Sequence, residues 1–217
     1  MRTLFMLLAL HLSACVDATP TSRSAESTEQ HAEATPPSPE LPAEWPTLPT
    51  GTAWPLSAEG SSIGFVGRKI TGQHVGGFNG LTGSVIVVDG AVVGATVNVD
   101  MGTTWSDNAK LTKHLLSGDF FDATTHPSAR FATADIQAGS AGTVTTHTIQ
   151  GVLDMRGTLG RVRVPSTIEV EGETARVRAS FHINRQQWGI KFPGKPDNLI
   201  QDDVEIQVDL KFEQPAG

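Results

Sequence analysis

Histidine and carboxylate side chains are the first candidates for chemistry in this chain. His114, Asp119, His126 and His182 are of the residue types that form general acid and base pairs. Their spacing argues against a catalytic pair. His114 falls near the end of a short predicted helix, where histidine commonly contacts the last carbonyls, and His182 shares the outward strand face of Arg178.

Recognised catalytic and metal-binding motifs are missing from the sequence. It contains no GxSxG, HExxH, Walker A or glycine-rich dinucleotide motif. His74, His114, His126 and His147 include no pair with the helical or hairpin spacing of metal ligands. We therefore predict that the protein is not an enzyme and has no catalytic residue, metal ligand or cofactor.

The single cysteine indicates a different chemistry. Cys15 follows small residues and an apolar run from Leu4 to Leu12, which is too short to span a bilayer and begins behind Arg2. The pattern resembles a bacterial lipobox, in which the cysteine thiol receives a diacylglyceryl group. It predicts a lipoprotein signal peptide over residues 1–14 and a lipid anchor at Cys15. The alternative is an ordinary signal peptide with an incidental cysteine.

Composition divides the rest of the chain in two. The 217 residues suffice for one domain with tails, and a net charge of −7 with a pI near 5.4 disfavours a nucleic-acid partner. Residues 16–43 consist mainly of Thr, Ser, Pro, Ala and Glu, which cannot bury enough apolar surface to fold. We predict a tether over residues 15–55, a folded domain over 56–213 and a short tail over 214–217.

Apolar residues alternate with polar ones along most of the predicted domain, which indicates half-buried antiparallel strands. Asp89-Gly90 fits a type I′ hairpin turn, and one helix is expected over residues 108–116 with Asp107 as its N-cap. The strands are expected at 61–66, 77–81, 84–88, 91–99, 130–136, 144–154, 159–164, 167–171, 174–183 and 204–212. They amount to about eight longer strands, which must close into a barrel or stack as a sandwich. Alternation alone does not choose between the two.

Several segments together resemble the YceI-like family. They are LTKHLLSGDFFD at 111–122, His126-Pro127, Arg130-Phe131, GVLDMRGT at 151–158, FHINR at 181–185, WGIKFPGK at 188–195 and LIQDDV at 199–204. The order and spacing hold from about Leu56 to Phe212. The resemblance implies an all-β fold, an extended antiparallel lipocalin-like barrel of about eight strands with one short helix. It also implies a tunnel for a long isoprenoid or related lipid, and binding without catalysis.

Ten residues are candidates to line such a tunnel, because they fall on predicted inward faces or follow the helix: Ile63, Phe65, Phe78, Val93, Val97, Phe120, Phe121, Phe131, Phe181 and Ile183. The alternative for each strand residue is a side chain that simply fills the core. Phe120 and Phe121 are interpreted either as a structural plug at one barrel end or as a lid over a ligand.

These expectations describe an envelope lipoprotein that binds a polyisoprenoid or other long-chain lipid for carriage, storage or sensing. Its anchor would hold it on the periplasmic face of a bacterial membrane, and Val16 after the cysteine favours the outer membrane. The alternative is a structural or interaction module with a filled barrel. The ligand, the pathway and the choice between monomer and homodimer stay open.

Overall fold

Antiparallel pairing of neighbouring strands runs through the described part of the chain. The computed structural model describes residues 44–139 and 145–216, so the predicted signal peptide, Cys15 and most of the predicted tether lie outside the described residues. Its elements are β1 (Thr52–Lys69), β2 (Gly72–Val88), β3 (Ala91–Ser106), α1 (Ala109–Leu116), β4 (Ser128–Ala138), β5 (His147–Met155), β6 (Thr158–Glu171), β7 (Thr174–Asn184), the 3₁₀ helix η1 (Arg185–Trp188), β8 (Gly194–Lys195) and β9 (Asn198–Glu213). Within these ranges no helix is both long and apolar enough to cross a membrane.

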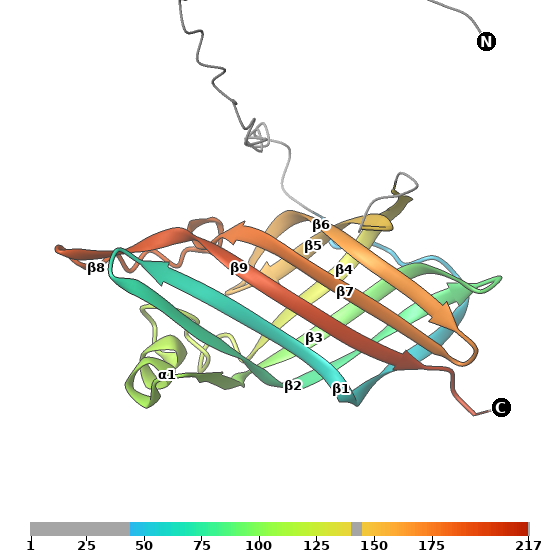
Figure 1. The fold of residues 1–217 in the computed structure, drawn as a ribbon, viewed down its shortest axis with the longest axis horizontal. Coiled ribbons are helices and arrows are strands. Elements are labelled where there is room, and N and C mark those ends of the chain that lie inside the picture. The colour runs from blue at the N-terminus through green and yellow to red at the C-terminus, as the bar shows by residue number, and fades with distance from the viewer. Residues whose placement is uncertain (1–43, 140–144, 217) are drawn as a thin grey trace, which may run out of the picture. The chain divides into compact units, whose positions relative to one another are not determined.

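Pairing between the first and last long strands closes the sheet. The strand order is β1-β2-β3-β4-β5-β6-β7-β9, and β1 also pairs with β9 along most of its length, from Leu56↔Phe212 to Lys69↔Ile200. The short β8 pairs only with β9 (Figure 1). A sandwich would leave the first and last strands as separate edges, so the barrel prediction is confirmed.

Three features differ from the strand positions expected from the sequence. The predicted strands at 77–81 and 84–88 are one strand, β2, and those at 159–164 and 167–171 are one strand, β6. Pro165 lies inside β6 opposite Thr148 and does not end the strand. The first strand begins at Thr52, before the expected domain start at residue 56. Asp89 and Gly90 both have positive φ, as the predicted hairpin turn requires.

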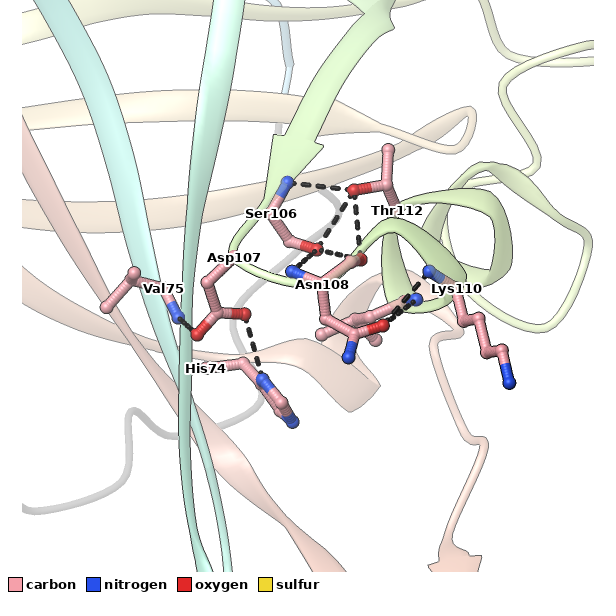
Figure 2. Close-up of polar contacts among 8 residues, drawn as sticks. His74, Val75, Ser106, Asp107, Asn108, Lys110 and Thr112 are labelled. Atoms are coloured by element: carbon pink, nitrogen blue, oxygen red, sulfur yellow. Dashed lines mark hydrogen bonds and ion pairs between the residues drawn. The ribbon is translucent and has the colours of Figure 1, made fainter.

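The predicted N-cap of the helix is wrong by one residue. Asn108 caps α1, and its Oδ1 accepts hydrogen bonds from the backbone N–H groups of Lys110 at 3.0 Å and Leu111 at 3.1 Å. The Asp107 carboxylate turns away to β2, where it accepts from His74 Nδ1 at 2.9 Å and from the Val75 N–H at 3.3 Å (Figure 2). Both residues are of types that commonly cap helices, but Asn108 caps α1 whereas Asp107 connects it to β2.

The core has two parts along the barrel. One contains Trp54, Val85 and Phe212 and lies toward the end where β1 begins. The other lies under α1 and includes Met101 and Trp188. Only 5 % of the Trp54 surface is exposed, so the start of β1 contributes a large apolar side chain to the barrel.

The position of Trp54 predicts where the folded unit must begin. A chain shortened to residues 39–217 should keep the stability of the full chain, whereas a chain starting at Leu56 should lose about 3–5 kcal/mol because the buried indole is removed. The pairing of Thr52–Pro55 with Val87–Ser84 is lost with it. Urea unfolding of the three proteins measures this difference. Equal unfolding midpoints for the two shortened chains would place the domain start at residue 56.

Candidate ligand-binding cavity

A cavity of about 230 Å³ lies inside the barrel. Its wall is formed by inward side chains of β1 to β7 and β9, and by residues of the cap over one end, from α1 and the segments that follow α1 and η1. Apart from Gly67, Arg130 and Arg185, the residues that line it are all aliphatic, aromatic or methionine. The cavity is therefore suited to an apolar ligand and offers few polar groups to orient one.

Nine of the ten candidate lining residues surround this cavity: Ile63, Phe65, Phe78, Val97, Phe120, Phe121, Phe131, Phe181 and Ile183. Val93 lies outside the lining, and its neighbours Val92 and Ala95 take part instead. The cause is a register shift, since Ile86 pairs with Gly94 while the next residue, Val87, pairs with Val92. Val93 is the extra residue of this bulge, and a bulge breaks the alternation of inward and outward side chains.

The sequence prediction also missed lining residues. Five of them are the apolar face of β9, whose alternation was visible in the sequence: Val204, Ile206, Val208, Leu210 and Phe212. Others are the small residues Ala95, Ala129 and Ala179. Nothing local in the sequence distinguishes an alanine beside a cavity from one in a packed core.

Aromatic rings close the cavity at the α1 end. Phe121 contacts Phe65 and Phe78, with ring centroids 6.3 and 5.9 Å apart. Its neighbour Phe120 packs instead against Phe192 at 5.4 Å. The backbone N–H of Phe121 donates to the Leu115 carbonyl, which fixes the segment to the end of α1. Both phenylalanines thus act as a cap and also line the cavity.

His114 holds this cap together. Its ring is edge-on to Phe120 at 4.9 Å and to Phe192 at 4.7 Å, and its Nε2 lies 2.7 Å from Asp119 Oδ2. His114 therefore connects α1 to the segment that follows it and to the segment after η1. Among the described residues, no group of three His, Cys, Asp or Glu side chains is placed to bind a metal ion.

Arg185 is the most deeply buried charged side chain beside the cavity, with 4 % of its surface exposed. Its guanidinium donates to the carbonyls of Ile190 and Gln201, and it pairs with Asp202 at 2.9 Å. These bonds tie the segment after η1 to β9. The Arg185 charge is thus satisfied by the protein itself, as a buried charge requires.

Two further carboxylates near this end have lowered pKa values. The hydrogen bond with His74 is the main cause that lowers the pKa of Asp107. Arg68 Nη2 lies 2.8 Å from Glu205 Oε2 and lowers the pKa of Glu205 to about 2. Both side chains are therefore ionised at neutral pH. Asp107 connects the start of α1 to β2, and Glu205 connects β9 to β1.

The family model for the YceI-like domain matches residues 54–212. The chain belongs to the YceI-like family. The matched range begins at the buried Trp54 and ends at Phe212, so it coincides with the closed barrel.

Individual relatives of this YceI-like chain are distant. A UPF0312 protein of Pseudomonas putida strain F1 is 30 % identical over 119 residues, which cover 51 % of this chain and 60 % of that relative's length. The crystal structure of BcnA from Burkholderia cenocepacia matches with a TM-score of 0.63 at 20 % identity, over 72 % of this chain and 98 % of BcnA. A polyisoprenoid binding domain from Saccharophagus degradans, implicated in plant cell wall breakdown, matches with a TM-score of 0.59 at 17 % identity, over 75 % of this chain and 98 % of that domain. At these identities the two structures establish the fold.

The two capping-type residues before α1 can be separated by mutation. Asn108→Ala should lower the free energy of unfolding by about 1 kcal/mol, because the side-chain acceptor of two helix amides is lost. Hydrogen exchange at the Lys110 and Leu111 amides should accelerate in this variant and stay unchanged in Asp107→Asn. If exchange at these amides were faster only in Asp107→Asn, the N-cap of α1 would be Asp107 and not Asn108.

Proposed function

We propose that this chain is a lipid-anchored protein of the bacterial cell envelope that binds a long isoprenoid or similar lipid chain inside its barrel. The lipid would be held for carriage, storage or sensing. Cys15 would carry the anchor, on the periplasmic face and in the outer membrane, and residues 16–51 would form the tether to the barrel. The observation that carries the binding proposal is the apolar cavity.

The size of the cavity supports a ligand on energetic grounds. At about 24 cal/mol per Å³, an empty cavity of 230 Å³ costs about 5 kcal/mol relative to a filled interior. That cost is comparable to the whole net stability of a small domain, about 5–15 kcal/mol. A bound hydrocarbon chain would recover it, because each methylene it buries contributes about 0.8 kcal/mol.

The nature of the wall indicates which ligand class fits. An apolar cavity of about 150 Å³ is enough to bind benzene, so 230 Å³ accommodates a larger hydrocarbon segment. The relative from Saccharophagus degradans is described as a polyisoprenoid binding domain, which agrees with an apolar chain as the ligand.

A packed barrel without a ligand is the alternative, and one observation favours it. The cavity is smaller than the about 300–1,000 Å³ of pockets that enclose drug-sized ligands. A long chain would therefore displace lining side chains or leave part of its length outside. In the alternative, the protein would act through its acidic exterior on a protein partner.

The lipid content of two matched variants separates these functions. Phe181→Gln should reduce copurified lipid several-fold, because an amide in the wall loses solvation when an apolar chain covers it. Arg178→Gln, on the outward face of the same strand, should leave the lipid content unchanged. Native mass spectrometry with lipid extraction measures both. Wild-type protein that carries no lipid after gentle isolation, and binds no isoprenoid or fatty acyl probe, would favour the packed barrel.

Filling the cavity gives a second readout of the same question. In Ala179→Leu, the larger side chain should exclude lipid and also raise the thermal unfolding temperature of the lipid-free protein. Loss of lipid together with a gain in stability cannot result from misfolding.

The anchor is tested separately. Cys15→Ser should release the protein from membrane pellets, because no hydroxyl can replace the thiol as the site of diacylglyceryl transfer. The measurement is the membrane-bound fraction after a high-salt wash. Equal retention of wild type and variant would refute the anchor and leave the cavity proposal unaffected.

A further inference from the structure

Lysine residues are distributed unevenly over the barrel. The sequence contains six lysines, and five of them, Lys69, Lys110, Lys113, Lys191 and Lys195, belong to α1, the end of β1 or the segment from η1 to β8. Figure 1 shows α1, β8 and the β1–β2 turn at one end of the barrel and the C terminus at the other. We call the first of these the lysine end. The sixth lysine, Lys211, lies near the opposite end and pairs with Glu213 at 2.7 Å.

Hydrogen bonds and a ring contact join the parts of the lysine end into one surface. Asn198 Oδ1 accepts from the Thr71 N–H at 3.2 Å and the Thr71 hydroxyl at 3.0 Å, which connects the β1–β2 turn to the β8–β9 turn. The ring contact between Phe192 and His114 connects the segment before β8 to α1. The lysines are therefore carried by elements that are fixed to one another.

None of these five lysines has a carboxylate partner among the described residues, and four of them are exposed. Among the carboxylates nearby, Asp202 pairs with Arg185 and Glu205 pairs with Arg68. Asp107 and Asp119 are held by hydrogen bonds to His74 and His114 and keep their negative charge. Asp122, Asp197 and Asp203 have no ion pair in the described part of the chain. The five lysines, together with Arg68, Arg156 and Arg185, therefore slightly outnumber the seven carboxylates here, on a chain whose net charge is −7.

The opposite end of the barrel carries exposed acidic side chains. Its hairpin turns present Asp89, Glu171 and Glu173, all exposed. The barrel is consequently polarised along its length, with positive charge at the capped end of the cavity. Such a distribution orients a protein toward an anionic surface.

Exposed apolar side chains accompany the lysines. Ile70 has 68 % of its surface exposed and Leu199 has 48 %, and the Ile70 N–H donates to the Leu199 carbonyl at 3.3 Å. The two residues are therefore neighbours, Ile70 in the β1–β2 turn and Leu199 at the start of β9. Apolar side chains next to lysines are the combination that binds the headgroup region of anionic membranes.

We propose that the lysine end docks on an anionic phospholipid membrane, with Ile70 and Leu199 entering the headgroup region and the lysines contacting lipid phosphates. This surface is distinct from the predicted anchor at Cys15, and it would bring the capped end of the cavity against the bilayer. Docking goes beyond the proposed lipid binding, and the two are measured independently.

Vesicle flotation tests the docking. The full chain is used with Cys15→Ser, so that no acyl anchor contributes and any binding by residues 1–14 is common to all variants. It should bind vesicles of equal parts phosphatidylcholine and phosphatidylglycerol, and bind pure phosphatidylcholine vesicles much more weakly. Lys191→Gln combined with Lys195→Gln should weaken binding about 30-fold, since each lysine near an anionic surface contributes about 1 kcal/mol. Ile70→Ser should weaken it about tenfold.

Matched controls come from the opposite end. Lys211→Gln and the hairpin variant Val88→Ser should bind the mixed vesicles as well as the parent chain. Equal loss in controls and test variants, or equal binding to both vesicle types, would overturn the proposal. The lipid content of each variant, measured by native mass spectrometry, shows whether a failure concerns docking alone or the cavity as well.

Discussion

The pairing of β1 with β9 is the constraint on which the rest of this structure depends. It removes both edges of the sheet and turns the apolar face of every long strand toward one interior. An eight-stranded barrel is just wide enough for side chains to fill it or to leave room for one ligand. Side-chain size then decides between the two. Small residues such as Ala95, Ala129 and Ala179 leave part of this interior open.

Closure of the wall leaves the ends of the barrel to be covered by other means. At one end the cover is built from α1, Phe120, Phe121 and the segment after η1, with apolar side chains inside and hydrogen bonds outside. Arg156 adds to these bonds by donating to the carbonyls of Gly189 and Gly118. The Trp188 indole packs against Gly160, at a place where any side chain would collide with it. The cover is therefore fixed to the wall on several sides.

Charges outside the barrel fall into two groups with different consequences. Cross-strand pairs such as Arg176 with Asp209 and Arg130 with Asp154 lie on the partly exposed wall, where such a pair contributes at most about 1 kcal/mol. The unpaired lysines around α1 and β8 do not stabilise the fold by pairing. Their concentration at one end instead favours association of that end with anionic surfaces.

Period-two alternation is a local property of the chain, so the sequence predicted an all-β domain, most strand positions and nine of the residues that line the cavity. Phe78, Phe131 and Phe181 lie on inward faces for that reason. The choice of a barrel over a sandwich came from the resemblance to the YceI-like family. The places where the alternation breaks depend on contacts between strands and could not be predicted locally. Val93 leaves the wall because of a register shift against β2, and Asp107 bonds to β2 because that strand lies beside the start of α1.

The cavity itself also depended on tertiary structure. Whether Ala179 borders empty space is set by the side chains of strands far away in the sequence, once β1 and β9 have closed the wall. The same holds for the lysine end, since Lys69, Lys113 and Lys195 are distant in the sequence and come to one surface only through the barrel. Alternation along a strand indicates which way a side chain points. The volume of a cavity and the net charge of a surface patch depend on residues that are brought together only by folding.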